Sequence, residues 1–150
     1  MQVRRFALIA LTIAISMAST TTAQAANVVV TSGSDAQAAL SYAYKQLGKD
    51  YCYGGTGPSC FDSAGLTKKA WAAGGVTLPR TTYGQYADTR RVNYSSLRPG
   101  DLVFFSGLGH VGIYVGAGKF IHAPSSGKKI QITSMATGYY RREYYGAGRP

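Results

Sequence analysis

The apolar residues in the first half of the chain follow a helical period. In SDAQAALSYAYKQLG, residues 34–48, they recur every three or four positions, which predicts a helix that Ser34 or Asp35 can cap and Gly48 can end. Residues 49–61 are rich in glycine and have no such period, so a loop is predicted there. This loop leads directly into a second periodic segment.

The second predicted helix covers residues 63–75, SAGLTKKAWAAGG. The apolar residues at helical spacing are Leu66, Ala70 and Trp71. The helix can end at Gly74 and Gly75. Asp62 directly precedes the helix and is of a residue type that caps helices, so Ser63 is expected in the first turn. Residues 79–92 lack a regular pattern and are predicted to be irregular, with one short helix.

The pattern changes to short β-type segments after LRPGD, a turn signal at residues 97–101. The segments are rich in β-branched and aromatic residues and are separated by glycine, proline or serine: LVFFS, HVGIYVG, KFIHA, KIQITSM and YYRREYYG. Helices first and strands after them predict an α+β domain. In such a domain, N-terminal helices pack on a C-terminal antiparallel sheet.

Residues 1–25 have the features of a signal peptide. Arg4 and Arg5 precede the apolar run FALIALTIAISM, and AQA at residues 23–25 offers a small-residue cleavage site. The apolar run is short for a membrane span, so no stable membrane insertion is expected after the leader is removed; a membrane-anchored chain is the alternative. We therefore expect a secreted protein, extracellular or associated with the cell wall, in which residues 26–150 form a single domain.

The domain is strongly basic. The whole chain has a formal charge of +10, and removing the two charges of Arg4 and Arg5 leaves +8, because all six acidic residues come later. This charge favours polyanionic partners, which include cell-wall polymers, anionic membranes and nucleic acid, and for a secreted chain the anionic bacterial envelope is the more natural partner. No nucleic-acid-binding motif accompanies it, so nucleic acid is not an expected partner. A protein partner remains open, and a monomer is expected.

Cys52 and Cys60 flank the short segment YGGTGPS. In a secreted protein this pair predicts a disulfide, which stabilises a loop of this length by about 2–3 kcal/mol in the chain-entropy description. The alternative is that Cys60 is a free nucleophile. A second cysteine only eight positions away favours the structural role.

The two histidines of the chain, His110 and His122, both fall in the predicted strands. HVGIYVGAGKFIH is typical of a β-hairpin. If its loop is the three residues GAG, Val115 pairs with Lys119 and His122 lies opposite Gly112, with His110 as its diagonal neighbour on the same face. The imidazoles would then lie close together, whereas a two-residue loop would place them on opposite faces.

The histidine pair and the predicted helix start at Asp62 and Ser63 together suggest nucleophilic catalysis. A nucleophile in the first turn of a helix lies at the positive end of its dipole, an imidazole can act as its base, and a second polar residue can orient that imidazole. The order would be nucleophile, His110, His122. The alternatives are a coincidental pair or a metal site, which two histidines without a third ligand form poorly. No metal and no cofactor is therefore expected.

Five segments in this order and spacing resemble the NlpC-type (p-sixty-like) cell-wall cysteine peptidases. They are QLGKDYCYGGTGPSCFDSAGL, LPRTTYGQY, LRPGDLVFF, GHVGIYVGAGKFIHAP and YYGAGRP, which extend over nearly all of residues 26–150. The resemblance implies a papain-like fold. It also implies an activity on the stem peptides of peptidoglycan, often beside D-glutamate and a diamino acid.

The resemblance assigns roles to individual residues. His110 matches the general base and His122 the residue that orients it. Tyr51 matches a tyrosine near the oxyanion site, and Asp62 matches a residue that helps to hold the peptide. The resemblance also favours the pairing of the two cysteines, because related exported members carry cysteines in this loop.

The chain departs from the family pattern at two neighbouring positions. Where the family has Asp-Cys-Ser-Gly this sequence reads DSAG, so Ser63 stands at the nucleophile position. Ala64 replaces a serine that contacts the substrate in some members. Cys60 lies three residues too early, before the predicted helix, to serve as the nucleophile.

Three interpretations follow. In the favoured one the protein binds wall peptides but is inactive or strongly impaired, a pseudoenzyme, because a serine hydroxyl stays protonated where a thiol would ionise. In the second, Ser63 is a working nucleophile, with His110 as its base, in an endopeptidase that hydrolyses D-glutamyl–diamino acid bonds. In the third, the serine was introduced to inactivate a peptidase, and the second change at Ala64 argues against this.

Overall fold

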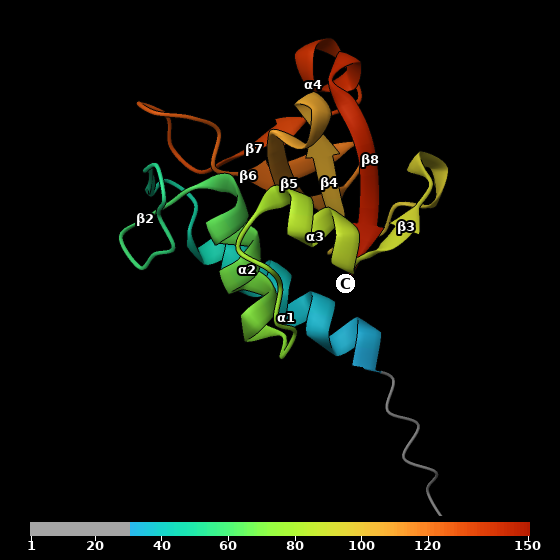
Figure 1. Cartoon of the computed structure of the whole chain (residues 1–150), viewed down its shortest axis with the longest axis horizontal. Helices are drawn as coiled ribbons and strands as arrows, with labels where there is room; N and C mark the ends of the chain where they lie inside the picture. The colour runs from blue at the N-terminus through green and yellow to red at the C-terminus, as the bar shows by residue number, and fades with distance from the viewer. Residues whose placement is uncertain (1–30) are drawn as a thin grey trace, which may run out of the picture.

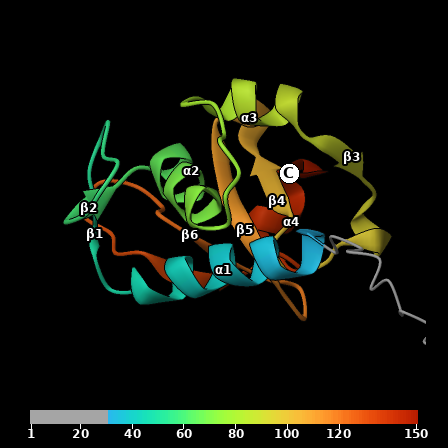
Figure 2. The same cartoon turned by 90° about the horizontal axis from the view of Figure 1, so that it is seen from below.

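The computed structural model describes residues 31–150, so the predicted signal peptide of residues 1–25 lies outside the described part of the chain. The N-terminal half contains three helices and two short strands: α1 (Thr31–Lys45), β1 (Asp50–Tyr51), β2 (Cys60–Phe61), α2 (Ser63–Ala73) and α3 (Thr82–Asp88). Strands β1 and β2 pair in parallel as a separate two-stranded sheet. Figures 1 and 2 show α1 and α2 side by side against one side of the main sheet.

The main sheet has six strands, and every pair of neighbours is antiparallel. Its order is β3-β8-β4-β5-β6-β7, with the bounds β3 (Arg90–Val92), β4 (Leu102–Phe105), β5 (His110–Gly116), β6 (Lys119–His122), β7 (Gln131–Ser134) and β8 (Tyr144–Arg149). Three short helices connect strands: η1 (Tyr94–Ser96), η2 (Ser106–Leu108) and α4 (Gly138–Arg142). The α+β fold with N-terminal helices packed on a C-terminal antiparallel sheet is confirmed.

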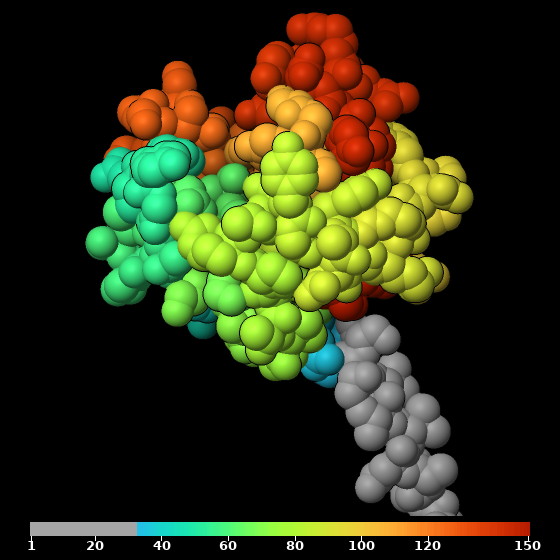
Figure 3. All heavy atoms as spheres, viewed as in Figure 1, coloured from blue at the N-terminus to red at the C-terminus, as the bar shows by residue number. Residues whose placement is uncertain are grey.

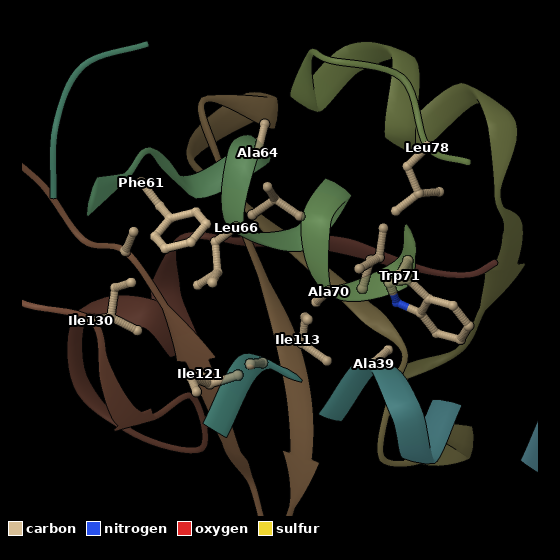
Figure 4. Packing of buried hydrophobic residues seen from close by; sticks show 14 of the residues in the cluster. Ala39, Phe61, Ala64, Leu66, Ala70, Trp71, Leu78, Ile113, Ile121 and Ile130 are labelled. Carbon is tan, nitrogen blue, oxygen red and sulfur yellow. The ribbon is translucent and has the colours of Figure 1, made fainter. Parts of the chain in front are cut away.

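Both faces of the central strands are buried. In β4, Leu102 and Phe104 point into a core shared with α1 and α2, whereas Val103 and Phe105 join a second core under η1 and α4. Figure 4 shows the first core, where Leu66 and Ala70 of α2 pack near Ile113 and Ile121 of the sheet. Because α2 is fixed against the sheet in this way, the position of its N-terminus is also fixed.

The predicted bounds of the first helix were shifted. Helix α1 begins at Thr31, so Ser34 and Asp35 lie within its first turns and do not precede it. The helix ends at Lys45, and the backbone N–H of Gly48 donates to the Ile130 carbonyl at 3.0 Å. Gly48 therefore belongs to the connection that leads away from the helix, where its φ of 82° is accessible to glycine.

Two strand predictions also needed correction. In the segment YYRREYYG the first residues form α4, and β8 begins only at Tyr144. Aromatic residues favour strands, but in α4 the ring of Tyr140 packs edge-on against Phe105 and Phe120 at centroid distances of 5.2 and 4.9 Å, so core packing overrides propensity. The region predicted to be irregular contains α3 as expected, and also β3, which pairs with β8.

The hairpin between β5 and β6 reaches the predicted register by a different route. Lys119 pairs with Gly116 and not with Val115, so the turn contains two residues and a bulge at Val115 interrupts the ladder. Beyond the bulge Ile113 pairs with Ile121, as predicted. A two-residue turn alone would shift the strand pairing by one residue, but the bulge leaves one residue unpaired and restores the register. The two histidines therefore stay on one face of the sheet.

Candidate active site

Ser63 is the first residue of α2, as the sequence predicted. The carboxylate of Asp62 caps this helix and accepts a hydrogen bond from the Gly65 backbone N–H at 2.6 Å. Gly65 is required here because a Cβ at this position would lie 2.0 Å from the carbonyl oxygen of Gly55. The absence of a Cβ lets the start of α2 lie close to the glycine-rich loop before it, where the Asp62 backbone N–H donates to the Gly55 carbonyl at 2.9 Å.

A cleft of about 510 Å³ opens at this helix start. Its lining comes from four stretches of the chain: Tyr51, Tyr53, Gly54, Asp62, Ser63, Ala64, Arg80, Thr81, Thr82, Tyr83, Leu108 and Gly109. Figure 3 shows the molecule hollowed between the teal loop near residue 53 and the light-orange segment near residue 108. Four residues to which the family resemblance assigns roles therefore share one cleft: Tyr51, Asp62, Ser63 and Ala64.

Arg80 is a residue of the cleft that received no role from the sequence. Its guanidinium binds both carboxylate oxygens of Asp62, at 3.0 Å to Oδ1 and 2.5 Å to Oδ2. Hydrogen bonding to Asp62 raises the pKa of Arg80, so its charge is permanent at neutral pH. The side chain keeps 40% of its surface exposed, and the Arg80–Asp62 ion pair lines the same cleft as Ser63.

A buried glutamine joins the Arg80 segment to the start of α2. The Nε2 of Gln85 donates to the carbonyls of Ala64 and Pro79, both at 3.0 Å, and its Oε1 accepts from the Thr67 hydroxyl at 2.7 Å. All the hydrogen-bonding groups of this amide are used, and the side chain is fully buried. The only sequence signal for it was its place in LPRTTYGQY, to which no role was assigned.

The predicted disulfide between Cys52 and Cys60 is present. It closes the loop that carries Tyr53, a residue that lines the cleft although it is 95% exposed. Cys60 is therefore not a free thiol, and its alternative role as a nucleophile is excluded in this oxidised form.

The two histidines lie together. His110 Nε2 is 2.8 Å from His122 Nδ1, a hydrogen-bonding distance, and the rings meet edge to face. Gly112 makes this approach possible, because a Cβ there would lie 3.1 Å from the Cβ of His122 and 2.7 Å from the Ile121 carbonyl. The register argument made from the sequence therefore placed both imidazoles correctly.

Aromatic rings enclose the histidine pair. Phe120 stacks on His122 at a centroid distance of 4.3 Å, Tyr140 lies edge-on to it at 5.1 Å, and His122 is fully buried. Burial lowers the pKa of His110 to about 4, and burial together with the adjacent His110 lowers the pKa of His122 to about 3. Both rings are therefore neutral at pH 7.

The far side of His122 contacts a residue that the sequence did not indicate. His122 Nε2 is 2.9 Å from the hydroxyl oxygen of Thr133 in β7. The connection between β6 and β7 is irregular over residues 123–130, so no turn pattern fixed which residue of β7 would face His122. A row of three polar side chains therefore replaces the predicted pair.

The serine and the histidines are not joined by a hydrogen bond. Within residues 31–150 the Ser63 hydroxyl makes none to His110. His110 lines a second hollow, of about 330 Å³, and Gly109 lines both this hollow and the cleft. The described residues contain no cluster of three or more His, Cys, Asp or Glu side chains that could hold a metal ion.

Comparison with known proteins gives a consistent family assignment. The profile of the NlpC/P60 family matches residues 48–149. The chain is 52% identical over 95 residues to the probable endopeptidase p60 of Listeria innocua, a match that covers 61% of this chain and 20% of that protein. It is 42% identical over 120 residues to the murein DD-endopeptidase MepH of Escherichia coli, covering 74% of this chain and 44% of that protein.

A solved structure agrees with the sequence matches. An NlpC/P60 family protein from Bacillus cereus superposes with a TM-score of 0.73 at 32% identity, covering 76% of this chain and 39% of that chain. The chain thus spans a fifth of the length of the Listeria relative and less than half of MepH. No helix within residues 31–150 has the length and apolar character needed to cross a membrane. The profile match and the shared papain-like fold show that this chain belongs to the NlpC/P60 family.

Proposed function

We propose that the protein binds peptidoglycan stem peptides in the cleft at the start of α2 and hydrolyses them very slowly or not at all. The observation that carries this proposal is Ser63, which begins α2 and lines the cleft where the family pattern has a cysteine. Two of the relatives support the substrate class, because p60 and MepH are both named endopeptidases and the name of MepH specifies murein.

The chemistry of serine explains the expected loss of activity. A helix N-terminus and a nearby imidazole can ionise a thiol, but they leave a serine hydroxyl protonated. A general base must therefore remove the hydroxyl proton during the attack. Burial lowers the pKa of His110 to about 4, which makes this imidazole a weak base. Each tenfold loss of rate corresponds to about 1.4 kcal/mol of barrier, and we expect a loss of several such factors.

The cleft retains groups that suit a stem peptide. Arg80 has N–H groups beyond those that bind Asp62 and can offer them to a peptide carboxylate, and Tyr53 and Tyr83 are 95% and 65% exposed at the rim of the cleft. Ala64, by contrast, removes a hydroxyl that would contact the substrate by family resemblance. The two changes in DSAG together support a protein that has lost efficient cleavage more strongly than a change of the nucleophile alone would.

The location and wider partners form part of the same proposal. The basic start, apolar run and AQA motif of residues 1–25 support export. The charge of +8 that remains after residues 1–25 supports attraction to an anionic cell-wall polymer. We infer a secreted monomer that works at the cell wall.

Binding in the cleft is tested by titrating a soluble stem tetrapeptide into the protein and into a Tyr83→Ala variant in a calorimeter. Tyr83 is exposed at the cleft, so its removal should weaken binding several-fold without disturbing the core. Tyr44→Ala is the matched control, because Tyr44 is an exposed tyrosine on α1 that does not line the cleft. The absence of binding, or an equal loss in both variants, would contradict the proposal.

A second candidate function is an active endopeptidase that uses Ser63. It is favoured by one observation: His110 still has a hydrogen-bonded partner, His122, that can orient it as a base. An active serine enzyme would release new amino termini from peptidoglycan, and His110→Ala would abolish that release. The favoured proposal expects no release above the level of the His110→Ala variant.

A further inference from the structure

A continuous row of polar side chains crosses three neighbouring strands. It runs from His110 in β5 to His122 in β6, at 2.8 Å, and on to the Thr133 hydroxyl in β7, at 2.9 Å. Thr133 pairs with Phe120 across the β6–β7 ladder, so it is the diagonal neighbour of His122 on the same face. His110 stands in the same diagonal relation to His122 across the β5–β6 ladder.

The row ends at the Thr133 hydroxyl. A second side chain, Gln131, lies opposite His122 in the ladder and donates from Nε2 to Thr133 Oγ1 at 3.3 Å. The hydroxyl oxygen has two lone pairs, enough to accept from Gln131 and from His122 together. Thr133 is only half-buried, so its own proton can point towards solvent.

Two arrangements of protons satisfy the row, because each neutral imidazole carries one N–H and one lone pair. In the first, His110 Nε2–H donates to His122 Nδ1, and His122 Nε2–H donates to Thr133 Oγ1. The remaining nitrogen of His110, Nδ1, then has a lone pair and can accept a proton. In the second, every bond is reversed, His110 Nδ1 carries the proton, and the ring cannot act as a base at that nitrogen.

Two considerations favour the first arrangement. Both rings then carry the proton on Nε2, which is the more stable tautomer of histidine in water. The oxygen of Thr133 accepts from both of its neighbours, which uses its two lone pairs fully.

We propose that Thr133 is a positioning residue: as the terminal acceptor of the row it holds both histidines in the Nε2–H form and so leaves the Nδ1 lone pair of His110 free to act as a base. The inference deepens the proposed function and rests on it only for the role of His110. If it is right, the chain has kept the orienting half of a hydrolytic site and has changed the nucleophile. Both imidazoles are neutral at pH 7, because burial lowers the pKa of His110 to about 4, and burial together with the adjacent His110 lowers the pKa of His122 to about 3, so each ring carries a single N–H there.

The test is the ¹⁵N chemical shift of the four imidazole nitrogens, measured by NMR on the ¹⁵N-labelled protein at pH 7. We expect shifts of the lone-pair type at Nδ1 and of the N–H type at Nε2 in both histidines. The opposite pattern in either ring would overturn the proposal. No substrate is present, so this result does not depend on whether the protein binds or cleaves a peptide.

Two variants show whether Thr133 causes the pattern. Thr133→Val keeps the β-branched shape but removes the acceptor, so His122 should move its proton to Nδ1 and His110 should become protonated at Nδ1. Thr133→Ser keeps the hydroxyl and should retain the original pattern. A Thr133→Val protein with unchanged tautomers, or a Thr133→Ser protein that behaves like the valine variant, would overturn the role of Thr133. If the valine variant does not fold, the wild-type and serine spectra still decide.

Discussion

At the scale of single residues, Asp62 has a structural task as well as the substrate contact that the family resemblance assigns. Its Oδ1 accepts from the Gly65 N–H, and both carboxylate oxygens bind Arg80. One side chain therefore fixes the first turn of α2, which carries Ser63, and the cation of the cleft. A peptide that contacts Asp62 would meet a carboxylate that is already held in place.

Replacing Asp62 tests this double role. Asp62→Ala leaves the Gly65 N–H and the Arg80 guanidinium without their partner, and we expect it to lower the free energy of unfolding by about 1–3 kcal/mol. Asp62→Asn is the control, because an asparagine can still cap the helix and should cost less. Urea denaturation measures both. Equal stability of the alanine variant and the wild type would show that the cap and the ion pair contribute nothing.

The two histidines predict how stability depends on pH. Burial lowers both pKa values in the folded protein, to about 4 and about 3, from the ordinary value of about 6.5. At pH values between the lowered pKa values and 6.5, the unfolded chain binds more protons than the folded protein does. The free energy of unfolding is therefore highest above pH 6.5 and falls as the pH falls. Going from pH 7 to pH 5 should cost about 2–4 kcal/mol.

This dependence is measured by denaturation at several pH values between 7 and 5, where most carboxylates stay ionised. The His110→Gln, His122→Gln double variant is the control and should show a much flatter curve over the same range. A wild-type curve as flat as that of the double variant would mean that the histidines are not buried as neutral rings.

At the scale of secondary-structure elements, the β5–β6 hairpin determines how the histidines meet. Its register depends on a bulge at Val115, and the close approach of the two strands opposite His122 depends on Gly112. The sequence predicted the register beyond the bulge correctly from a three-residue loop, although the turn has two residues. Turn length and bulge compensate for each other, and a sequence pattern shows only their combined effect on which residues face the core.

Gly112→Ala tests the hairpin geometry. The new Cβ would lie 2.7 Å from the Ile121 carbonyl and 2.5 Å from the Phe120 ring, so the strands must separate, which we expect to cost about 1–3 kcal/mol. Gly33→Ala is the matched control in α1, where nothing lies within 4 Å of the new Cβ, and should be neutral or stabilising by about 0.5–1 kcal/mol. Chemical denaturation compares the two. An undisturbed Gly112→Ala protein would contradict the close approach of β5 and β6.

Other elements show where sequence patterns fail. Helix α2 was predicted closely because its cap, apolar stripe and terminal glycine all indicate the same helix. Helix α4 was missed because the tyrosines in its sequence also suit a strand, and only the core formed by Phe105 and Phe120 decides between the two. Local signals were sufficient where they agreed, and long-range packing decided where they conflicted.

At the scale of the whole molecule, the cleft is a product of long-range packing. Its lining comes from the disulfide loop and the start of α2, from the segment around Arg80, and from the turn before His110. Asp62 and Ser63 entered the candidate site through the predicted helix start and then the family resemblance, and Tyr51 and Ala64 entered through the resemblance alone. Arg80 and Thr133 were missed. No periodicity or turn signal connects these distant segments, so the structure was needed to bring them together.

The central claim is that the site binds a peptide but lacks an effective nucleophile. It is tested most directly by comparing the wild-type protein with its Ser63→Cys variant on purified peptidoglycan, with new amino termini followed by mass spectrometry. We predict that the cysteine variant releases peptide ends at least about 100-fold faster, a difference of about 2.7 kcal/mol in barrier. Robust cleavage by the wild-type protein at a rate equal to that of the cysteine variant would contradict the account.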